Sequence, residues 1–275
     1  MAEKNLKVGI ALGSGSARGW AHIGVLRALE KAGIAPDIVC GTSIGALVGA
    51  VYADDDVAAL EEWVTGLTWR KVLGFFDISF GGGILKGAKL TGFLRDNFME
   101  KEIAGLARPF AAVATDLHSG REVWLREGSV VEAVRASIAL PGLFSPWERD
   151  GRQLIDGALV NPVPVSLCRA MGADFVIAVD LGSNMIGRHM TNAESGKRGK
   201  KPLNMIEVVT TSLNIMSTRI TRSRLAGEPA DAVISPRLGR LGLLDYHRAT
   251  EAIAEGRAAT EIMIPQIRGL LSDAM

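Results

Sequence analysis

Residues 38–53 of the chain read IVCGTSIGALVGAVYA, and this stretch decides how we expect the fold to be built. It opens with the β-branched run Ile38-Val39-Cys40, which is typical of the end of a buried strand. The next five residues, 41–45, match G-x-S-x-G, and residues 46–53 are small and apolar, as in a buried helix. The pattern predicts a serine on a sharp turn between a strand and a helix, the arrangement called a nucleophile elbow.

Physical reasons explain why these residue types occur in the turn. Side chains two positions before and after a strained Ser43 would collide, so Gly41 and Gly45 relieve the crowding. The start of the following helix carries unpaired N–H groups and the positive end of the helix dipole, and both favour a developing negative charge.

Two other interpretations of the stretch remain open from the motif alone. G-x-S-x-G is a weak match in a chain with 32 glycines among 275 residues, so an ordinary buried helix also explains it. Gly41, Gly45 and Gly49 also form a small-xxx-small series, which is typical of membrane helices. The 16 apolar residues would span about 24 Å as a helix, short of a hydrocarbon core of about 30 Å, and aspartates border them on both sides.

The segments around this stretch alternate between strand and helix patterns. Residues 7–12 predict a strand, and residues 20–31 predict a helix that ends at Gly33. With the elbow, this βαβα order predicts an α/β fold: a three-layer sandwich with a mostly parallel central sheet and helices on both faces. The length and a hydrophobic content of 48% fit one domain over residues 1–275.

The second half of the chain supplies further elements. We expect a hairpin over 110–125, a strand at 153–156 that ends in Asp156, and a buried strand at 175–181. Two long helices are predicted, over 203–225 and 245–271. Their inward residues are expected to be Met205, Ile206, Val209, Leu213, Met216 and Ile220 in the first, and Ile253, Ile262 and Ile264 in the second.

Composition excludes several classes of function. A net charge of +1 favours no nucleic-acid partner. The first ten residues lack the apolar segment of a secretory signal, and Cys40 and Cys168 are isolated, so we expect a cytoplasmic protein. Cysteines and histidines show no metal-ligand spacing, and we expect neither a metal nor another cofactor. Composition makes no prediction about the oligomeric state.

Two segments of the sequence are compatible with contact with a membrane, but each also has another interpretation. Residues 75–98 mix aromatic residues, three consecutive glycines and two lysines, which fits either a mobile, membrane-touching lid or a loop packed under its own side chains. Residues 183–202 hold five basic residues and one acidic residue, which predicts a flexible basic loop. That loop is either simply solvated or in peripheral contact with anionic lipid, at about 1 kcal/mol per basic residue.

The loop at 13–19 reads GSGSARG and also has alternative interpretations. A dinucleotide site would need glycine or alanine at position 18, which is Arg18. A turn of small residues can instead present backbone N–H groups to an oxyanion, with Arg18 adding charge or fixing the loop. A simple tight turn fits the loop equally well.

Four stretches in this order together resemble the patatin-like phospholipase family in its compact bacterial form. They are Arg18-Gly19 leading into AHIGVLRALEKAGI, then GTSIGALVGA, ASIALPGLFSPW and DGALVNPVPV. The resemblance extends from about residue 7 to 182 and is far more specific than any one motif. It implies a serine lipid acyl hydrolase of the phospholipase A or lysophospholipase type, which acts on phospholipid or another acyl ester through an acyl-enzyme.

The resemblance also implies which residues carry the reaction. Ser43 corresponds to the nucleophile and Asp156 to the general base of a Ser-Asp dyad. The implied oxyanion hole is the loop Ser14, Gly15, Ser16, Ala17, Arg18 and Gly19. The family's run of three glycines reads Ser14-Gly15-Ser16 here, and the turn after the base reads Asp156-Gly157-Ala158, where glycine is frequent at the third place.

Two other functions stay open from the sequence. The same dyad would serve a thioesterase or an esterase with a soluble substrate, since no strong membrane anchor is present. The serine-substituted loop also fits a signalling or binding module that retains the scaffold with weak turnover.

Overall fold

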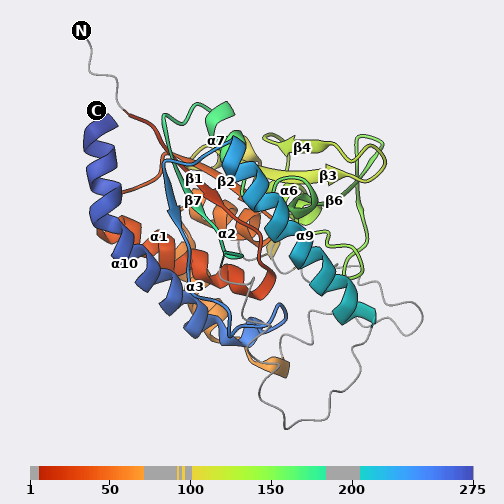
Figure 1. The fold of residues 1–275 in the computed structure, drawn as a ribbon. Helices are drawn as coiled ribbons and strands as arrows, with labels where there is room; N and C mark the ends of the chain where they lie inside the picture. Colours follow the sequence, from red (N-terminus) through yellow and green to blue (C-terminus); the bar gives the residue numbers. More distant parts are fainter. Residues whose placement is uncertain (1–5, 71–91, 93–94, 97–100, 184–204, 275) are drawn as a thin grey trace.

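The computed structural model describes residues 6–70, 92, 95–96, 101–183 and 205–274, and a central eight-stranded sheet organises them (Figure 1). The sheet order is β5-β6-β3-β2-β1-β7-β8, with β4 also paired to β3. The strands are β1 Val8–Leu12, β2 Ile38–Thr42, β3 Phe110–Asp116, β4 Glu122–Leu125, β5 Trp147–Arg149, β6 Arg152–Asp156, β7 Phe175–Val179 and β8 Ala232–Ile234.

The sheet is mixed, with a parallel centre. Strand β1 pairs in parallel with β2 and β7, and the parallel pairing continues to β3 on one side and to β8 on the other. Strands β4 and β6 pair with β3 in the antiparallel direction, and β5 pairs with β6 in the same way. This arrangement puts the ends of β2 and β6 close together.

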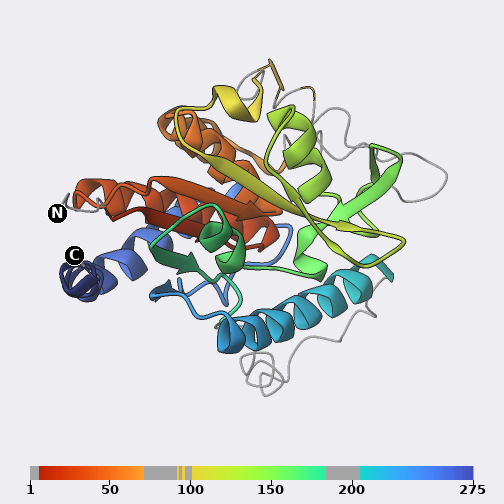
Figure 2. The ribbon, with the colours of Figure 1, turned by 90° about the horizontal axis from the view of Figure 1, so that it is seen from above.

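Helices cover both faces of the sheet (Figure 2), which confirms the predicted α/β fold. The helices are α1 Ala21–Lys31, α2 Ile44–Ala53, α3 Val57–Thr65, α6 Val130–Ser137, α7 Val165–Ala170, α9 Met205–Gly227 and α10 Ala249–Ala274. Short 3₁₀ turns are η1 Ser16–Trp20, η3 Ile103–Gly105, η4 Gly157–Leu159 and η5 Tyr246–Arg248.

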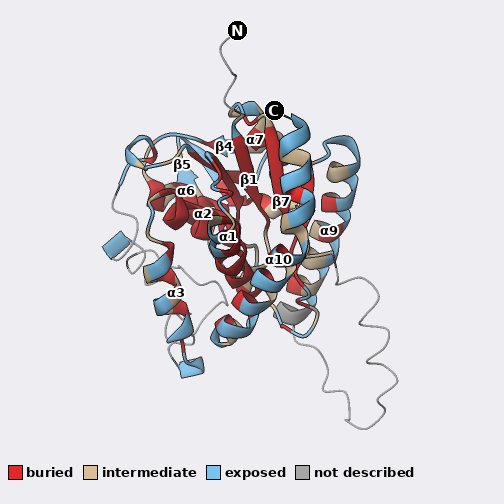
Figure 3. Ribbon diagram, turned by 90° about the vertical axis from the view of Figure 1, so that its left-hand side faces the viewer, coloured by how far each residue is buried: buried red, intermediate tan, exposed pale blue. Residues whose placement is uncertain are grey.

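Alternation along the strands divides the core into two layers. Ile10 and Leu12 of β1 point into the larger cluster, with side chains of α1, α2, α6 and α10. Ala11, between them, points into the smaller cluster with Leu167 and Cys168 of α7. The buried layers follow the sheet and the inner helices (Figure 3). The β-branched and small residues of the strands therefore pack against apolar side chains on both faces of the sheet.

Some predictions about inward faces are wrong. Met216 on α9 is 47% exposed, and Ile262 on α10 is 73% exposed. Small residues form most of the packed face of α10, whose buried residues are Ala249, Ala252, Ile253, Gly256, Thr260 and Ile267.

Several predictions concern residues that the structure does not describe. Nearly all of residues 75–98 and of the basic loop at 183–202 lie outside the described ranges. Among the helices that are described, none combines the length and the apolar content needed to cross a bilayer.

Candidate active site

Ser43 lies at the tip of the turn between β2 and α2, with a positive φ of 57°. This strained conformation is the one expected for a nucleophile elbow. The flanking glycines are needed because backbone crowds the turn. A Cβ on Gly41 would lie 2.3 Å from the carbonyl oxygen of Gly45, and one on Gly45 would lie 2.1 Å from that of Leu12.

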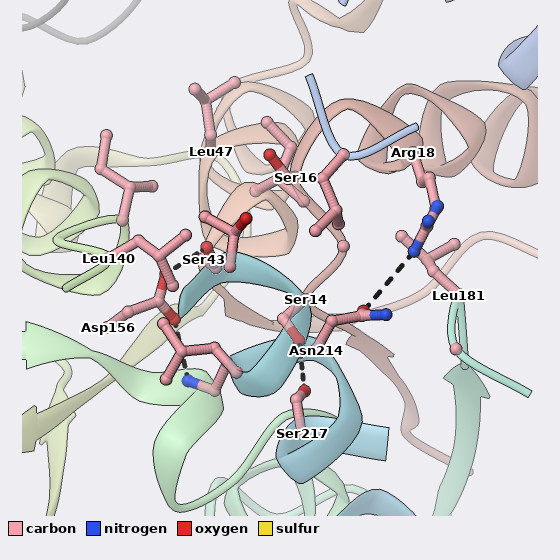
Figure 4. Close-up of a pocket in the computed structure, with 18 of the residues that line it drawn as sticks. Ser14, Ser16, Arg18, Ser43, Leu47, Leu140, Asp156, Leu181, Asn214 and Ser217 are labelled. Atoms are coloured by element: carbon pink, nitrogen blue, oxygen red, sulfur yellow. Dashed lines mark hydrogen bonds between the residues drawn. The ribbon is translucent and has the colours of Figure 1, made fainter. Parts of the chain in front are cut away.

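The hydroxyl of Ser43 is in direct contact with the carboxylate of Asp156 (Figure 4). Ser43 Oγ donates a hydrogen bond of 2.6 Å to Asp156 Oδ2, across 113 positions of sequence. Antiparallel pairing of β6 with β3, next to β2, brings the aspartate to the elbow. Ser43 is thus the proton donor and Asp156 the acceptor, which is the arrangement that a nucleophile and its general base require.

Asp156 is held firmly in a dry environment. Its side chain accepts a second hydrogen bond of 2.8 Å at Oδ1 from the amide of Ala158, which follows Gly157 in turn η4. Only 1% of the residue is exposed. Burial raises the pKa of the Asp156 carboxyl from 3.8 to about 6, against the opposing effect of the hydrogen bonds from Ser43 and Ala158. Burial therefore makes the carboxylate a stronger base.

Ser137, at the end of α6, is a residue whose role the sequence reasoning missed. Its hydroxyl accepts a 2.8 Å hydrogen bond from the backbone N–H of Ser43 and donates a 2.6 Å bond to the carbonyl of Val113 on β3. The serine stands in the block ASIALPGLFSPW, which marked the stretch but no single residue. It links the elbow to the strand beside it.

The loop predicted as an oxyanion hole lies next to this pair, but three of its six amides donate to carbonyls of the protein. The backbone N–H groups of Ser14, Ala17 and Arg18 donate to the carbonyls of Pro162, Leu243 and Gly15. Gly19 lies inside η1. Among the described residues, no acceptor is recorded for the N–H groups of Gly15 and Ser16, and both residues line the cavity at Ser43.

A third amide of the same kind belongs to Ile44, the residue after the serine. It is the first residue of α2, where helical N–H groups have no partner within the helix, and it lines the same cavity. The predicted set of loop residues did not include it, although the elbow motif puts a free amide directly after the serine.

The side chains of the loop are fixed by the C-terminal part of the chain. Ser16 has a positive φ of 52°, and its hydroxyl is 2.7 Å from the phenol oxygen of Tyr246 in η5. Arg18 Nε donates to the carbonyl of Leu241 at 2.9 Å. Ser16 thus keeps a left-handed backbone where the resemblance expects glycine, and a side-chain contact supports it.

The described histidines do not serve the serine. His22 is buried and its Nε2 lies 2.7 Å from the carbonyl oxygen of Gly13, and burial lowers its pKa to about 4. His118 and His247 are exposed. Within the described ranges, no group of three or more histidine, cysteine or acidic side chains is arranged to hold a metal ion.

The pair opens into a cavity with one apolar and one polar part. The apolar wall includes Leu47, Leu67, Ile138, Leu143 and Phe144. The polar wall comes from α9, from Ser14 and Arg18 of the loop, and from Asp180 after β7. A chain of methylene groups fits the first wall, and a hydrogen-bonding group fits the second.

The chain is similar to several known proteins. The family profile described as "Patatin-like phospholipase" matches residues 10–169. An uncharacterized NTE family protein of Mycobacterium tuberculosis is 32% identical over 322 aligned positions, which cover 92% of this chain and 89% of that protein. The human patatin-like phospholipase domain-containing protein 6 is 37% identical over 184 positions, which cover 64% of this chain and 13% of the human one. The crystal structure of VipD from Legionella pneumophila aligns with 95% of this chain and 67% of VipD, with a TM-score of 0.49 and 14% identity.

Proposed function

Because this chain belongs to the patatin-like phospholipase family, we propose that it is a lipid acyl hydrolase that uses Ser43 and Asp156 as a catalytic dyad. The observation that carries the proposal is the 2.6 Å hydrogen bond from the strained serine to the buried carboxylate. Its substrate would be a phospholipid, a lysophospholipid or another acyl ester.

In the proposed reaction, Ser43 Oγ attacks the ester carbonyl while its proton passes to Asp156 Oδ2. The tetrahedral oxyanion accepts hydrogen bonds from the free N–H groups of Gly15, Ser16 and Ile44. Collapse of this intermediate expels the alcohol, which takes the proton from Asp156 and leaves an acyl group on Ser43. Asp156 then takes a proton from a water molecule as that water attacks the acyl-enzyme, and it returns the proton to Ser43 Oγ as the fatty acid leaves.

The environment of the pair supports these roles. A free aspartate with a pKa near 3.9 is a weak base for a serine hydroxyl. A carboxylate with a pKa of about 6 is better matched to that task near neutral pH. The apolar wall of the cavity gives the acyl chain a place next to the serine.

We propose that residues 1–275 act as one domain without a cofactor. Two free buried cysteines, Cys40 and Cys168, support a reducing compartment such as the cytoplasm. Peripheral contact with a membrane also stays a proposal, because the loops that suggested it lie outside the described residues.

The test is hydrolysis of p-nitrophenyl butyrate together with labelling by a fluorophosphonate. We expect the label on Ser43, and a loss of kcat of about a thousandfold or more in Ser43→Ala and in Asp156→Asn. Ser119→Ala, an exposed serine in the β3–β4 turn, is the matched control and should retain both label and turnover. Retained hydrolysis in purified Ser43→Ala would refute the dyad. A strong preference for acyl-CoA over micellar phospholipid would favour a thioesterase instead.

A further inference from the structure

Helix α9 buries polar side chains and exposes apolar ones, which is the reverse of an ordinary surface helix. Its buried residues include Thr210, Thr218 and Thr221, whereas Ile215 and Met216 are about half exposed. A surface helix normally buries its apolar stripe and exposes its polar one. The inward face of α9 therefore has a reason to be polar, and that face lines the cavity at Ser43.

The polar face presents hydrogen-bonding groups that have not all found partners in the protein. Thr218 and Thr221 donate their hydroxyl protons to carbonyls one turn earlier in α9, so their oxygens remain acceptors. Ser217 Oγ is 3.3 Å from Ser14 Oγ. The amide nitrogen of Asn214, Nδ2, has no recorded acceptor among the described residues, although Asn214 lines the cavity.

Arg18 adds a positive charge to the same wall. The residue is 4% exposed, and among the described residues no carboxylate lies within ion-pair distance of its guanidinium. Nε is held by the carbonyl of Leu241, and one terminal nitrogen is 3.5 Å from Asn214 Oδ1 (Figure 4). Burial lowers the pKa of Arg18 to about 10, so the side chain is still charged at neutral pH. Asp245 also attracts this cation, but its carboxylate pairs with Arg248 rather than with Arg18, so an anionic ligand would stabilise the buried guanidinium.

We propose that this wall, defined by Asn214 and Ser217 of α9 with Arg18, is a subsite for the phosphodiester of a phospholipid headgroup. The proposal rests on the proposed function for its substrate class. Arg18 would supply charge, and Asn214 would donate from Nδ2 to a phosphate oxygen. Asp180 lines the same cavity and opposes a second negative charge, so we expect the singly charged diester to be preferred over free phosphate. Asn214 is then a residue that determines specificity and is not a catalytic one.

Two ether lipids that the enzyme cannot hydrolyse test this assignment by binding alone. They are 1-O-dodecyl-glycero-3-phosphocholine and 1-O-dodecylglycerol, which share the chain and differ in the phosphodiester. By calorimetry below micellar concentrations, we expect the wild-type protein to bind the first at least tenfold more tightly. Asn214→Leu should reduce this ratio at least fivefold, because Leu has a similar volume and cannot hydrogen-bond.

Ser212→Leu, on the exposed face of α9, is the matched control and should keep the wild-type ratio. If Asn214→Leu does not fold, as judged by thermal unfolding, Ser217→Ala replaces it with the same expected direction. Equal binding of the two ethers by the wild type, or an unchanged ratio in the variant, overturns the subsite. Displacement of the phosphocholine ether by equimolar inorganic phosphate would also overturn the headgroup assignment. Preferential binding without any ester hydrolysis would instead leave the subsite standing and refute the proposed function.

Discussion

At the scale of single residues, the carboxyl of Asp156 decides how the proposed reaction should depend on pH. Its pKa of about 6 belongs to the group that must be ionised to accept the proton of Ser43. We expect kcat/KM for p-nitrophenyl butyrate to fall about tenfold for each pH unit below that pKa and to level off above it. A rate that stays flat down to pH 4 would contradict the assignment of Asp156 as the base.

The same carboxyl should leave a mark on stability, which serves as an independent control. The native state holds this proton more tightly than the unfolded chain, because its pKa is raised from 3.8 to about 6. The free energy of unfolding should therefore fall as pH rises through this window, by up to about 3 kcal/mol from this group. Asp156→Asn removes this titration. In urea unfolding, the free energy of unfolding of the variant minus that of the wild type should therefore increase as pH rises over the same interval.

At the scale of secondary-structure elements, the elbow is held in place by α6 and β3 through one hydroxyl. Ser137→Ala would leave the partly buried backbone N–H of Ser43 without its acceptor, at a cost of about 1–3 kcal/mol. We expect a lower melting temperature and a loss in kcat with little change in KM, since the nucleophile and not the substrate loses its support. Unchanged kcat in a destabilised variant would mean that Ser137 is structural only. The exposed Ser223→Ala on α9 provides the reference for a harmless serine substitution.

Features that depend on local sequence could be predicted from the residues, whereas contacts between distant elements could not. The elbow and its strand–helix order depend on local periodicity and on glycines at fixed spacing, and the α/β fold predicted from them is confirmed. The pairing of Ser43 with Asp156 is non-local, since it depends on β6 lying antiparallel to β3, and the sequence indicated it only through resemblance. The catalytic roles of the two residues stay a prediction.

Other features escaped prediction because burial was judged from hydrophobicity. Thr210, Thr218 and Thr221 are buried on α9 because they face a cavity rather than a packed core. Ile262 is exposed because α10 packs through its small residues, and position 262 lies on the other side of the helix from Thr260. A periodic apolar pattern indicates a helix reliably, but it does not indicate which face a neighbouring element needs.

At the scale of the whole molecule, α10, the last helix of the chain, lies along α1, the first one (Figure 1). The turn η5, which precedes α10, carries Tyr246, whose phenol contacts Ser16 in the loop at the candidate active site. The C-terminal helix therefore anchors the element that supports this loop. Helices α1 and α10 approach closely because Gly24 of α1 and Gly256 of α10 each face the backbone of the other helix.

Gly256→Ala should for that reason be far more damaging than an alanine elsewhere on α10. A Cβ on Gly256 would lie 2.0 Å from the carbonyl oxygen of Ala21, and backbone atoms cannot move aside as a flexible side chain can. We expect a loss of about 2 kcal/mol or more in urea unfolding, together with reduced turnover as η5 shifts away from the loop. Gly269→Ala is the matched control on the same helix, because a Cβ there meets nothing within 4 Å. Alanine's higher helix propensity should make that variant more stable by about 0.5–1 kcal/mol. Equal effects of the two substitutions would mean that α10 does not pack on α1 through Gly256.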